Sequence, residues 1–202
     1  MRIVTARELE NWLANGETLE RDTRGPKVVA LKNAGGGDVY LKIFHTRRLP
    51  FLARLFPPAA RFARNTGILE ALNIPCPKVI KTFWINPSAG LSACLYHPLP
   101  GTTLETLLQQ NPEKLKASLP RLAGFIRQIH GHGIYFRSLH IGNIVQMPDG
   151  NFGLIDVLDL KRWIFALGRR HVRRNFRHLE RHLERRALND FPLEELYRLY
   201  FK

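Results

Sequence analysis

The amino-acid sequence predicts an α+β protein with a strand-rich first half and a helix-rich second half. Short β-branched and aromatic runs, separated by Gly, Pro and Asn, dominate the chain up to Tyr96. Apolar residues at helical spacing dominate after Gly101. At 202 residues the chain has the size of one large domain or two small lobes, and we expect it to divide into residues 1–97 and 98–202.

The first half is expected to follow the order strand, strand, helix, strand, strand. Residues 33–38 form a glycine-rich turn between the first two apolar runs, and Pro75 and Pro77 end the helix. The expected elements are strands at 28–31 and 39–44, a helix that begins after Pro57 and Pro58, and strands at 78–85 and 91–96.

The second half is expected to be mainly helical. Pro120 should fall in the first turn of the second helix, where proline is tolerated. Pro148, Asp149 and Gly150 supply the turn of a hairpin. The expected elements are helices at 102–110 and 117–132, hairpin strands at 143–146 and 152–155, and a helical tail from Lys161 onward.

The charge balance is strongly positive. There are 31 Lys and Arg against 17 Asp and Glu, so the net charge is +14, which indicates an anionic partner. Cys76 and Cys94 are too few for a disulfide framework or a cysteine-built zinc site. The chain begins with early acids and has no apolar run of ~18 residues. We therefore expect a cytoplasmic protein without a secretory signal or a membrane span.

A polar loop followed by an acid in an apolar run indicates phosphate chemistry. Phosphoryl transfer needs a cation for the phosphates, oxygen ligands for Mg²⁺ and a group that orients the acceptor hydroxyl. Asn143 ends the loop RSLHIGN, and Asp156 follows 13 residues later in LIDVLD. Lys42 lies in the apolar strand VYLKIF, either on a solvent face or directed into a cleft.

In this order and spacing, five segments resemble the protein-kinase-like superfamily, in particular bacterial lipopolysaccharide (Kdo/heptose) kinases and toluene-tolerance-type proteins. They are VYLKIF, GILEALNIPCPKV, LYHPLPGTTL, IRQIHGHGIYFRSLHIGNIV and LIDVLD. The resemblance covers roughly residues 28–161. It implies a small bilobal fold with a β-rich N-terminal lobe and a reduced α-rich C-terminal lobe.

The resemblance also implies the roles of the site residues and the cofactors, ATP and Mg²⁺. Lys42 would pair with Glu70 and hold the phosphates, and Tyr96 would lie at the hinge beside the nucleotide. Asn143 and Asp156 would bind Mg²⁺.

The sequence departs from the family in its loop. The family has an Asp five residues before the metal-binding Asn, and this chain has Ser138, which cannot act as a carboxylate base near neutral pH. Ser138 and His140 are expected to line the acceptor site. His140 is either a hydrogen-bonding loop residue or a substitute acid–base group, and Asp159 is either the N-cap of the tail helix or a second acid near the phosphates.

Glycines and histidines outside this loop have plainer interpretations. The phosphate-covering loop at 22–27 is reduced to Gly25, and residues 35–37 are expected to form a hairpin turn. His130 is expected to be structural and to bond to the loop backbone. His178 and His182 have metal-binding spacing on a helix but lack an evident third ligand.

The segment from Lys161 to Arg186 carries ten Lys or Arg and two acids, a net charge of +8. Apolar residues interleave with these charges. The segment is therefore either a helix packed on its lobe with a solvated charged face, or a surface for anionic lipid or a phosphorylated sugar.

Three functional hypotheses follow. The first is an ATP- and Mg²⁺-dependent kinase that phosphorylates a sugar hydroxyl of lipopolysaccharide core or a related envelope glycolipid, with peripheral contact to the anionic inner membrane through 161–186. The second is a pseudokinase, a nucleotide-binding or interaction module in envelope biogenesis, which Ser138 favours. The third, a nucleic-acid-binding protein, rests on charge alone because no binding motif is present.

Overall fold

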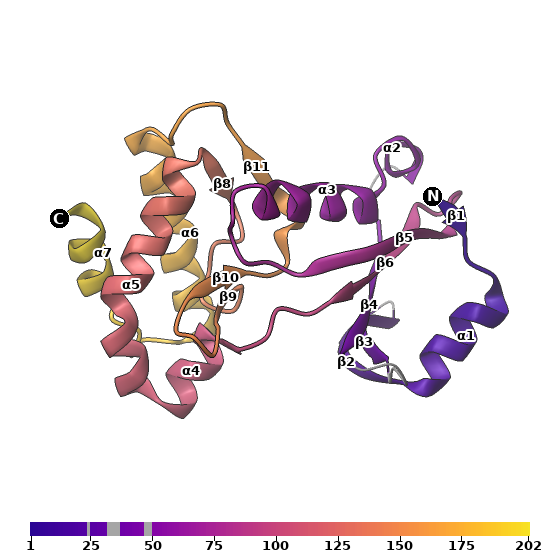
Figure 1. Cartoon of the computed structure of the whole chain (residues 1–202), viewed down its shortest axis with the longest axis horizontal. Helices are drawn as coiled ribbons and strands as arrows, with labels where there is room; N and C mark the ends of the chain where they lie inside the picture. Colours follow the sequence, from indigo (N-terminus) through magenta and orange to yellow (C-terminus); the bar gives the residue numbers. More distant parts are fainter. Residues whose placement is uncertain (24, 32–36, 47–49) are drawn as a thin grey trace. The chain divides into compact units, whose positions relative to one another are not determined.

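The computed structural model describes residues 1–23, 25–31, 37–46 and 50–202 (Figure 1). The chain divides into two compact units, residues 1–68 with 77–98 and residues 69–76 with 99–202. Most strand residues lie in the first unit and most helical residues in the second, so the predicted α+β, bilobal class is confirmed. The expected domain division at residue 97 stays a prediction.

The first unit is built on a sheet with the strand order β1-β5-β6-β4-β3-β2. Strand β1 pairs with β5 in parallel, and the other neighbours are antiparallel. The strands are β1 (Arg2–Ile3), β2 (Gly16–Asp22), β3 (Gly25–Leu31), β4 (Val39–Phe44), β5 (Lys78–Asn86) and β6 (Leu91–His97). The helices are α1 (Ala6–Asn15), α2 (Pro50–Leu55) and α3 (Pro58–Glu70).

The four strands and the helix expected in this half are present, but the expected order omitted β1, α1, β2 and α2. Helix α1 has no buried residue and begins with a capping box in which Thr5 and Glu8 bond reciprocally. Strand β2, GETLERD, has no buried position either. An edge strand without an apolar face lacks the alternation that identifies a strand in sequence.

Alternation along β4 directs its side chains to two different neighbours. Leu41 and Ile43 join Val29 and Ala93 in a buried cluster against which α1 packs Leu9, Trp12 and Leu13. Lys42 and Phe44 point to the opposite face, where the Phe62 ring of α3 lies 5.6 Å from the Phe44 ring. The sequence VYLKIF therefore places one lysine on an apolar face.

The second unit is mainly helical. Two small sheets accompany the helices, with strand orders β10-β9-β7 and β11-β8. The strands are β7 (Thr102–Thr103), β8 (Ile134–Phe136), β9 (Ile144–Gln146), β10 (Phe152–Leu154) and β11 (Leu160–Arg162). The helices are α4 (Leu104–Gln110), α5 (Pro112–Gly131), the 3₁₀ turn η1 (Val157–Asp159), α6 (Arg169–Arg186) and α7 (Leu193–Phe201).

Helix α5 buries one apolar face in this unit, and the expected hairpin of β9 and β10 is present. The helix begins at Pro112, so Pro120 lies in its interior and not in its first turn as expected. Proline there leaves the carbonyl of Lys116 without its helical donor. Because Lys116 is exposed, water can bond to this carbonyl.

Residues 69–76 belong to the second unit because they bond to its hairpin. The amide of Leu154 donates to the carbonyl of Pro75 over 2.9 Å. Gly153 lies against Pro75 and Leu99 so closely that a β-carbon would contact both. This close approach explains the glycine in the second hairpin strand.

The tail is not one continuous helix from Lys161, as the sequence analysis expected. Lys161 pairs with Tyr135 and Arg162 with Ile134 in the β11–β8 ladder. Helix α6 begins only at Arg169, and α7 follows after a break near Phe191. No helix within the described ranges is both long and apolar enough to cross a membrane.

A buried histidine of α5 predicts a pH-dependent stability. His130 is bonded through Nδ1 to the Tyr200 hydroxyl (2.8 Å) and through Nε2 to Oδ1 of Asn175 (3.1 Å). Burial lowers the pKa of His130 to about 4. Between pH 6.5 and 4 the unfolded chain therefore binds a proton that the folded chain does not, and the free energy of unfolding falls as the pH falls.

The expected loss from His130 is on the order of 3 kcal/mol between pH 7 and pH 4. Urea unfolding of the parent and of His130→Gln across this range measures it, and the variant should show the shallower pH dependence. His132→Gln, at an exposed position two residues away, is the matched control. An identical pH dependence in all three proteins would contradict the prediction.

Candidate functional site

A loop between β8 and β9 carries the polar residues that the sequence analysis selected. Two buried apolar side chains, Leu139 and Ile141, hold it to the second unit at 2% and 0% exposure. The amide of Leu139 donates to the carbonyl of Phe136, and the amide of Asn143 donates to the carbonyl of His140. The loop backbone is therefore fixed by packing and by turns.

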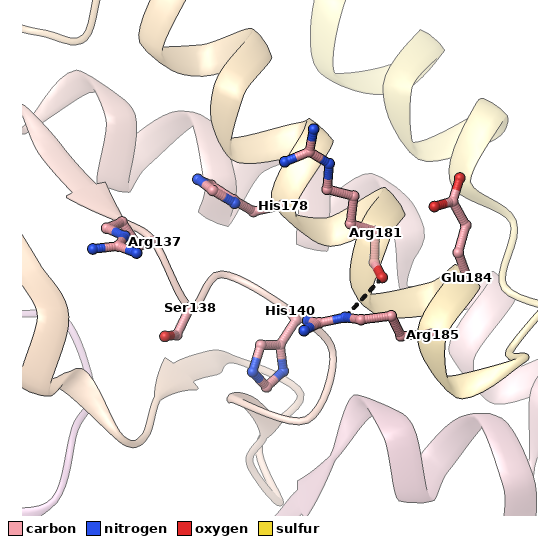
Figure 2. A pocket seen from close by; sticks show the side chains of 7 residues that line it. All are labelled: Arg137, Ser138, His140, His178, Arg181, Glu184 and Arg185. Atoms are coloured by element: carbon pink, nitrogen blue, oxygen red, sulfur yellow. Dashed lines mark hydrogen bonds between the residues drawn. The ribbon is translucent and has the colours of Figure 1, made fainter. Parts of the chain in front are cut away.

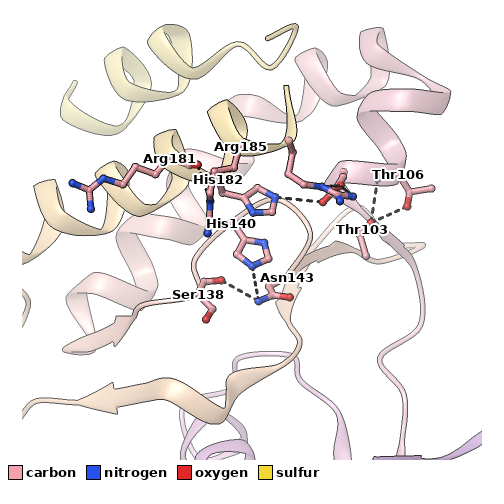
Figure 3. Close-up of polar contacts among 10 residues, drawn as sticks. Thr103, Thr106, Ser138, His140, Asn143, Arg181, His182 and Arg185 are labelled. Atoms are coloured by element: carbon pink, nitrogen blue, oxygen red, sulfur yellow. Dashed lines mark hydrogen bonds and ion pairs between the residues drawn. The ribbon is translucent and has the colours of Figure 1, made fainter. Parts of the chain in front are cut away.

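Asn143 connects the loop to the strand that leads into Asp156. Its side-chain nitrogen donates to the carbonyl of Ser138 and to Nε2 of His140, each over 3.1 Å (Figure 3). Its own carbonyl accepts from the amide of Ile155 over 2.9 Å. Asn143 thus lies beside the residue that precedes Asp156, and the amide oxygen of its side chain is the atom that a cation would use.

Asp156 follows β10 in a left-handed conformation, with φ 53° and ψ 45°. Residues other than glycine adopt this region rarely, although Asp and Asn tolerate it best. The conformation ends the extended segment and starts the 3₁₀ turn η1. The chain therefore bends at Asp156, and strained positions of this kind cluster at functional sites.

His140 lies between Asn143 and a second histidine. Its ring stacks on His182 of α6, with 3.9 Å between ring centroids and 4° between planes (Figure 3). Burial, with a contribution from the charge of His182, lowers the pKa of His140 to about 4. Because the amide nitrogen of Asn143 can only donate, Nε2 of His140 accepts and the neutral ring carries its proton on Nδ1.

This arrangement favours the loop hydrogen-bonding role of His140 over the acid–base role. The lone pair of Nε2 is already used by Asn143. Nδ1 is buried and lacks a hydrogen-bond partner among the described residues. A ring that is neutral at pH 7 and engaged in this way orients Asn143.

His182 and Glu105 connect the loop to helices α6 and α4. Nε2 of His182 lies 3.4 Å from Oε2 of Glu105, and Arg186 donates to Oε1 of Glu105 over 2.7 Å. Although burial raises the pKa of Glu105, Arg186 and His182 lower it by more. The amide of Glu105 donates to the carbonyl of Ile141, so α4 is bonded directly to the loop.

Ser138 donates a hydrogen bond to a carboxylate that lies 21 residues further along the chain. Its hydroxyl bonds to Oδ2 of Asp159 over 2.8 Å. Oδ1 of Asp159 is buried and has no hydrogen-bond partner among the described residues. The N-cap of α6 is Gly168, so the interpretation of Asp159 as the N-cap of a tail helix is wrong. The loop that lacks its own Asp is in contact with an Asp from η1.

A cavity of about 390 Å³ opens beside Ser138 (Figure 2). The loop contributes one side of the lining and α6 the other. The lining residues are Arg137, Ser138, His140, His178, Arg181, Glu184 and Arg185. Three arginines against one carboxylate, that of Glu184, make this a cavity for an anionic group, with the Ser138 hydroxyl in its lining.

His178 and His182 have different partners in the structure. His178 bonds to the Tyr135 hydroxyl over 3.1 Å, whereas His182 stacks on His140. Among the described residues no group of three or more His, Cys, Asp or Glu is arranged to hold a metal ion.

Asn143 and Asp156 offer the kind of oxygen ligands that a hard cation binds. Carboxylate and amide oxygens are the ligands that Mg²⁺ prefers, and Mg²⁺ commonly keeps waters and takes substrate phosphates as its remaining ligands. This donor set suits a cation that arrives with a phosphate group.

Lys42 and Tyr96 lie in the first unit, on the face of the sheet that α3 covers. Lys42 is 6% exposed, so it is not a solvent-facing lysine, and its ammonium lies 5.4 Å from the centre of the Phe62 ring. Tyr96 packs edge-on against Tyr40 and Phe62. The faces of aromatic rings attract a cation, so Phe44 and Phe62 provide a favourable surface for this ammonium group.

Glu70 is the exposed last residue of α3 and belongs to the second unit. Its pairing with Lys42 stays a prediction. Of the glycines considered for phosphate contact, Gly25 begins β3 with φ 121° and pairs with Asp22. The triple glycine lies outside the described residues except for Gly37.

No pattern in the sequence indicates Glu105 or the contact between Ser138 and Asp159. Arg181 and Arg185 likewise do not stand out from the other basic residues of the tail. The one sequence feature that could have indicated them is their spacing of four residues, because residues four apart on a helix share a face. Which of the helix faces meets the loop depends on the tertiary structure.

These features define the class of protein. A strand-rich unit contains a buried lysine, and a helical unit carries Asn143 in a loop and Asp156 at the following bend. These are component parts of a kinase-like phosphotransferase. The phosphotransferase enzyme family model (APH) matches residues 22–197. The chain belongs to this family.

Other comparisons are more distant. The chain is similar to the kinase PK-1 of the Cydia pomonella granulovirus, at 15% identity and a TM-score of 0.44, over 77% of this chain and 56% of that one. The chain thus spans a little over half the length of that kinase. A comparison with curated proteins finds no match.

Proposed function

We propose that this protein transfers the γ-phosphate of ATP to a sugar hydroxyl of lipopolysaccharide core or a related envelope glycolipid. Membership of the phosphotransferase family supports the reaction class. The observation that carries the choice of acceptor is the arginine-lined cavity beside Ser138. An acceptor with a phosphate or carboxylate next to its reacting hydroxyl fits this cavity.

Ser138 and Asp159 would handle the proton of the acceptor. The Ser138 hydroxyl already donates to Asp159, so its oxygen is left as an acceptor for a hydrogen bond from the sugar hydroxyl. As the sugar oxygen bonds to the γ-phosphorus, the bond from that phosphorus to the β,γ-bridging oxygen would break and ADP would leave with the electron pair. The sugar proton would pass to the Ser138 oxygen, and the Ser138 proton would pass to Oδ2 of Asp159. The pair would therefore replace the carboxylate that the loop lacks.

The remaining residues have binding roles in this proposal. Asn143 and Asp156 would hold Mg²⁺, which neutralises charge on the phosphates when it is bound. Lys42 would contribute a positive charge to the phosphates. His140 would orient the Asn143 amide through the bond that its neutral ring accepts.

Transfer of labelled phosphate from ATP to soluble core oligosaccharide tests the proposal. Intact oligosaccharide and oligosaccharide with its phosphates removed should be compared, and we expect transfer to the intact form. Absence of transfer to any core acceptor, in a protein that binds ATP, would overturn the kinase proposal.

Loss of the cavity arginines is expected to weaken acceptor binding. In Arg181→Gln/Arg185→Gln the acceptor KM should rise by about 100-fold or more, because two charge-assisted hydrogen bonds are lost and each contributes about 1.5–3 kcal/mol. The KM for ATP should change little. Arg170→Gln/Arg177→Gln removes the same charge from the same helix outside the cavity and is the matched control.

The second candidate is a pseudokinase that binds nucleotide as an interaction module. Ser138 in place of the loop Asp favours it. The two candidates differ in turnover, since a pseudokinase would show ATP binding with no transfer to any acceptor. The bond from Ser138 to Asp159 is the reason to prefer the enzyme.

A further inference from the structure

The loop that joins β11 to α6 exposes three large apolar side chains in succession. Trp163, Ile164 and Phe165 are 48%, 94% and 81% exposed. In α6, by contrast, the apolar face is buried, and its members are Val172, Phe176, Leu179 and Leu183. The helix therefore has no free apolar face for a membrane or a partner, whereas the loop before it does.

The backbone of this loop is fixed at both ends. The amide of Trp163 donates to the carbonyl of Gly133 over 2.8 Å, and the amide of Leu167 donates to the carbonyl of His130 over 2.9 Å. Gly133 has φ 71°, and a β-carbon there would contact the carbonyl oxygens of Trp163 and Phe165. The apolar side chains thus project from an ordered loop, so little entropy is lost when they bind.

The surroundings of the loop are cationic. From Leu160 to Leu179 the sequence contains seven Lys or Arg and no acid. Arg162 precedes the loop, Arg169 and Arg170 follow it, and all three are exposed. The loop (orange in Figure 1) lies between β11 and the N-terminal end of α6. An apolar tip between positive charges is complementary to a surface that is apolar inside and negative at its boundary.

We propose that residues 163–168 insert into the interface of an anionic lipid bilayer while the flanking arginines bind its headgroups. Trp163 has the amphipathic ring that is enriched at membrane interfaces. Ile164 and Phe165 supply the apolar contact. This docking surface requires neither ATP nor an acceptor, so its test is independent of the proposed function.

Co-sedimentation with vesicles measures the contribution of the apolar tip. Vesicles of phosphatidylcholine containing phosphatidylglycerol should bind the parent, and Ile164→Glu/Phe165→Glu should lower the partition coefficient by about 100-fold or more. Leu55→Glu/Phe56→Glu is the matched control, since those side chains are 68% and 71% exposed. Equal losses in both double variants would overturn the proposal, because any added negative charge would then suffice.

A second pair of variants measures the electrostatic contribution of the flanking arginines to vesicle binding. Arg169→Gln/Arg170→Gln should lower partitioning by about 30-fold at low salt, because each basic residue near an anionic surface contributes about fivefold. The control Arg61→Gln/Arg64→Gln removes two exposed arginines of α3. Vesicles of phosphatidylcholine alone should bind the parent weakly, and equal binding to both vesicle types would contradict the electrostatic part.

Insertion itself is measured by fluorescence quenching with brominated lipid. Quenching should occur in the parent and be largely lost in Trp163→Phe, which keeps Trp12 and Trp84 as background. Sedimentation velocity without lipid should give the same mass for the parent and Ile164→Glu/Phe165→Glu. A parent dimer that this variant converts to monomer, with no vesicle binding, would instead assign the loop to self-association.

Discussion

Replacing Asp156 with asparagine is expected to abolish both phosphate transfer and the stabilisation of the protein by Mg²⁺ and ATP. The substitution removes the carboxylate charge that would hold the cation. Asparagine tolerates the left-handed backbone of this position nearly as well as aspartate does, so the fold should be retained. In the parent, ligand at about 100 times its dissociation constant should add about 2.7 kcal/mol to the free energy of unfolding.

Thermal unfolding with and without millimolar Mg²⁺ and ATP measures this effect. Asp149→Asn is the control, since Asp149 lies in the hairpin turn and bonds to Asn151. If the melting temperature of the parent does not change with nucleotide, the ATP-binding part of the proposal is contradicted. If Mg²⁺ and ATP still raise the melting temperature of Asp156→Asn, residues other than Asp156 hold the cation.

Replacing Asp159 with asparagine is expected to slow phosphate transfer by about 100- to 10,000-fold, the usual contribution of general-base assistance. Asparagine keeps an acceptor for the Ser138 hydroxyl but cannot take its proton. The double variant Ser138→Asp/Asp159→Asn moves the carboxylate into the loop and should recover much of the rate. Ser138→Asp alone places two carboxylates side by side, and their mutual repulsion should make this single variant slower than the double variant.

Turnover of these three variants, measured with the same acceptor, decides the role of Asp159. Asp190→Asn, an exposed aspartate of the same unit, is the control. Full turnover in Asp159→Asn would show that this carboxylate takes no part. In that case Ser138 would act by positioning alone, which phosphoryl transfer through a loose transition state permits.

The parts of the fold that could be predicted are those with local patterns. Strand β4 and the β9–β10 hairpin followed from apolar alternation and turn chemistry, which operate over a few residues. Strand β2 could not be predicted because it has no buried position and its five central residues are exposed. Its position comes from pairing with β3, which no pattern within β2 indicates.

The candidate site divides in the same way. Asn143 and Asp156 are near one another because a short hairpin separates them, and a motif with fixed spacing can indicate this. The contact of Ser138 with Asp159 spans 21 residues, and that of Glu105 with His182 spans 77. Such contacts depend on how helices and strands pack, so the supporting residues could not be found from spacing.

The sequence by itself determined the α+β class, the phosphotransferase-like residue pattern and the strong positive charge of the region from Lys161 to Arg186. Only the tertiary structure decided which apolar residues of this region are buried and which are exposed. Residues 160–162 pair with β8 as β11, and helix α6 begins only at Arg169 with its apolar face buried. Trp163, Ile164 and Phe165 therefore lie on an exposed loop between the two elements. The reason is physical: amphipathic spacing specifies that one face will be buried, whereas the partner that buries it is fixed by contacts between distant segments.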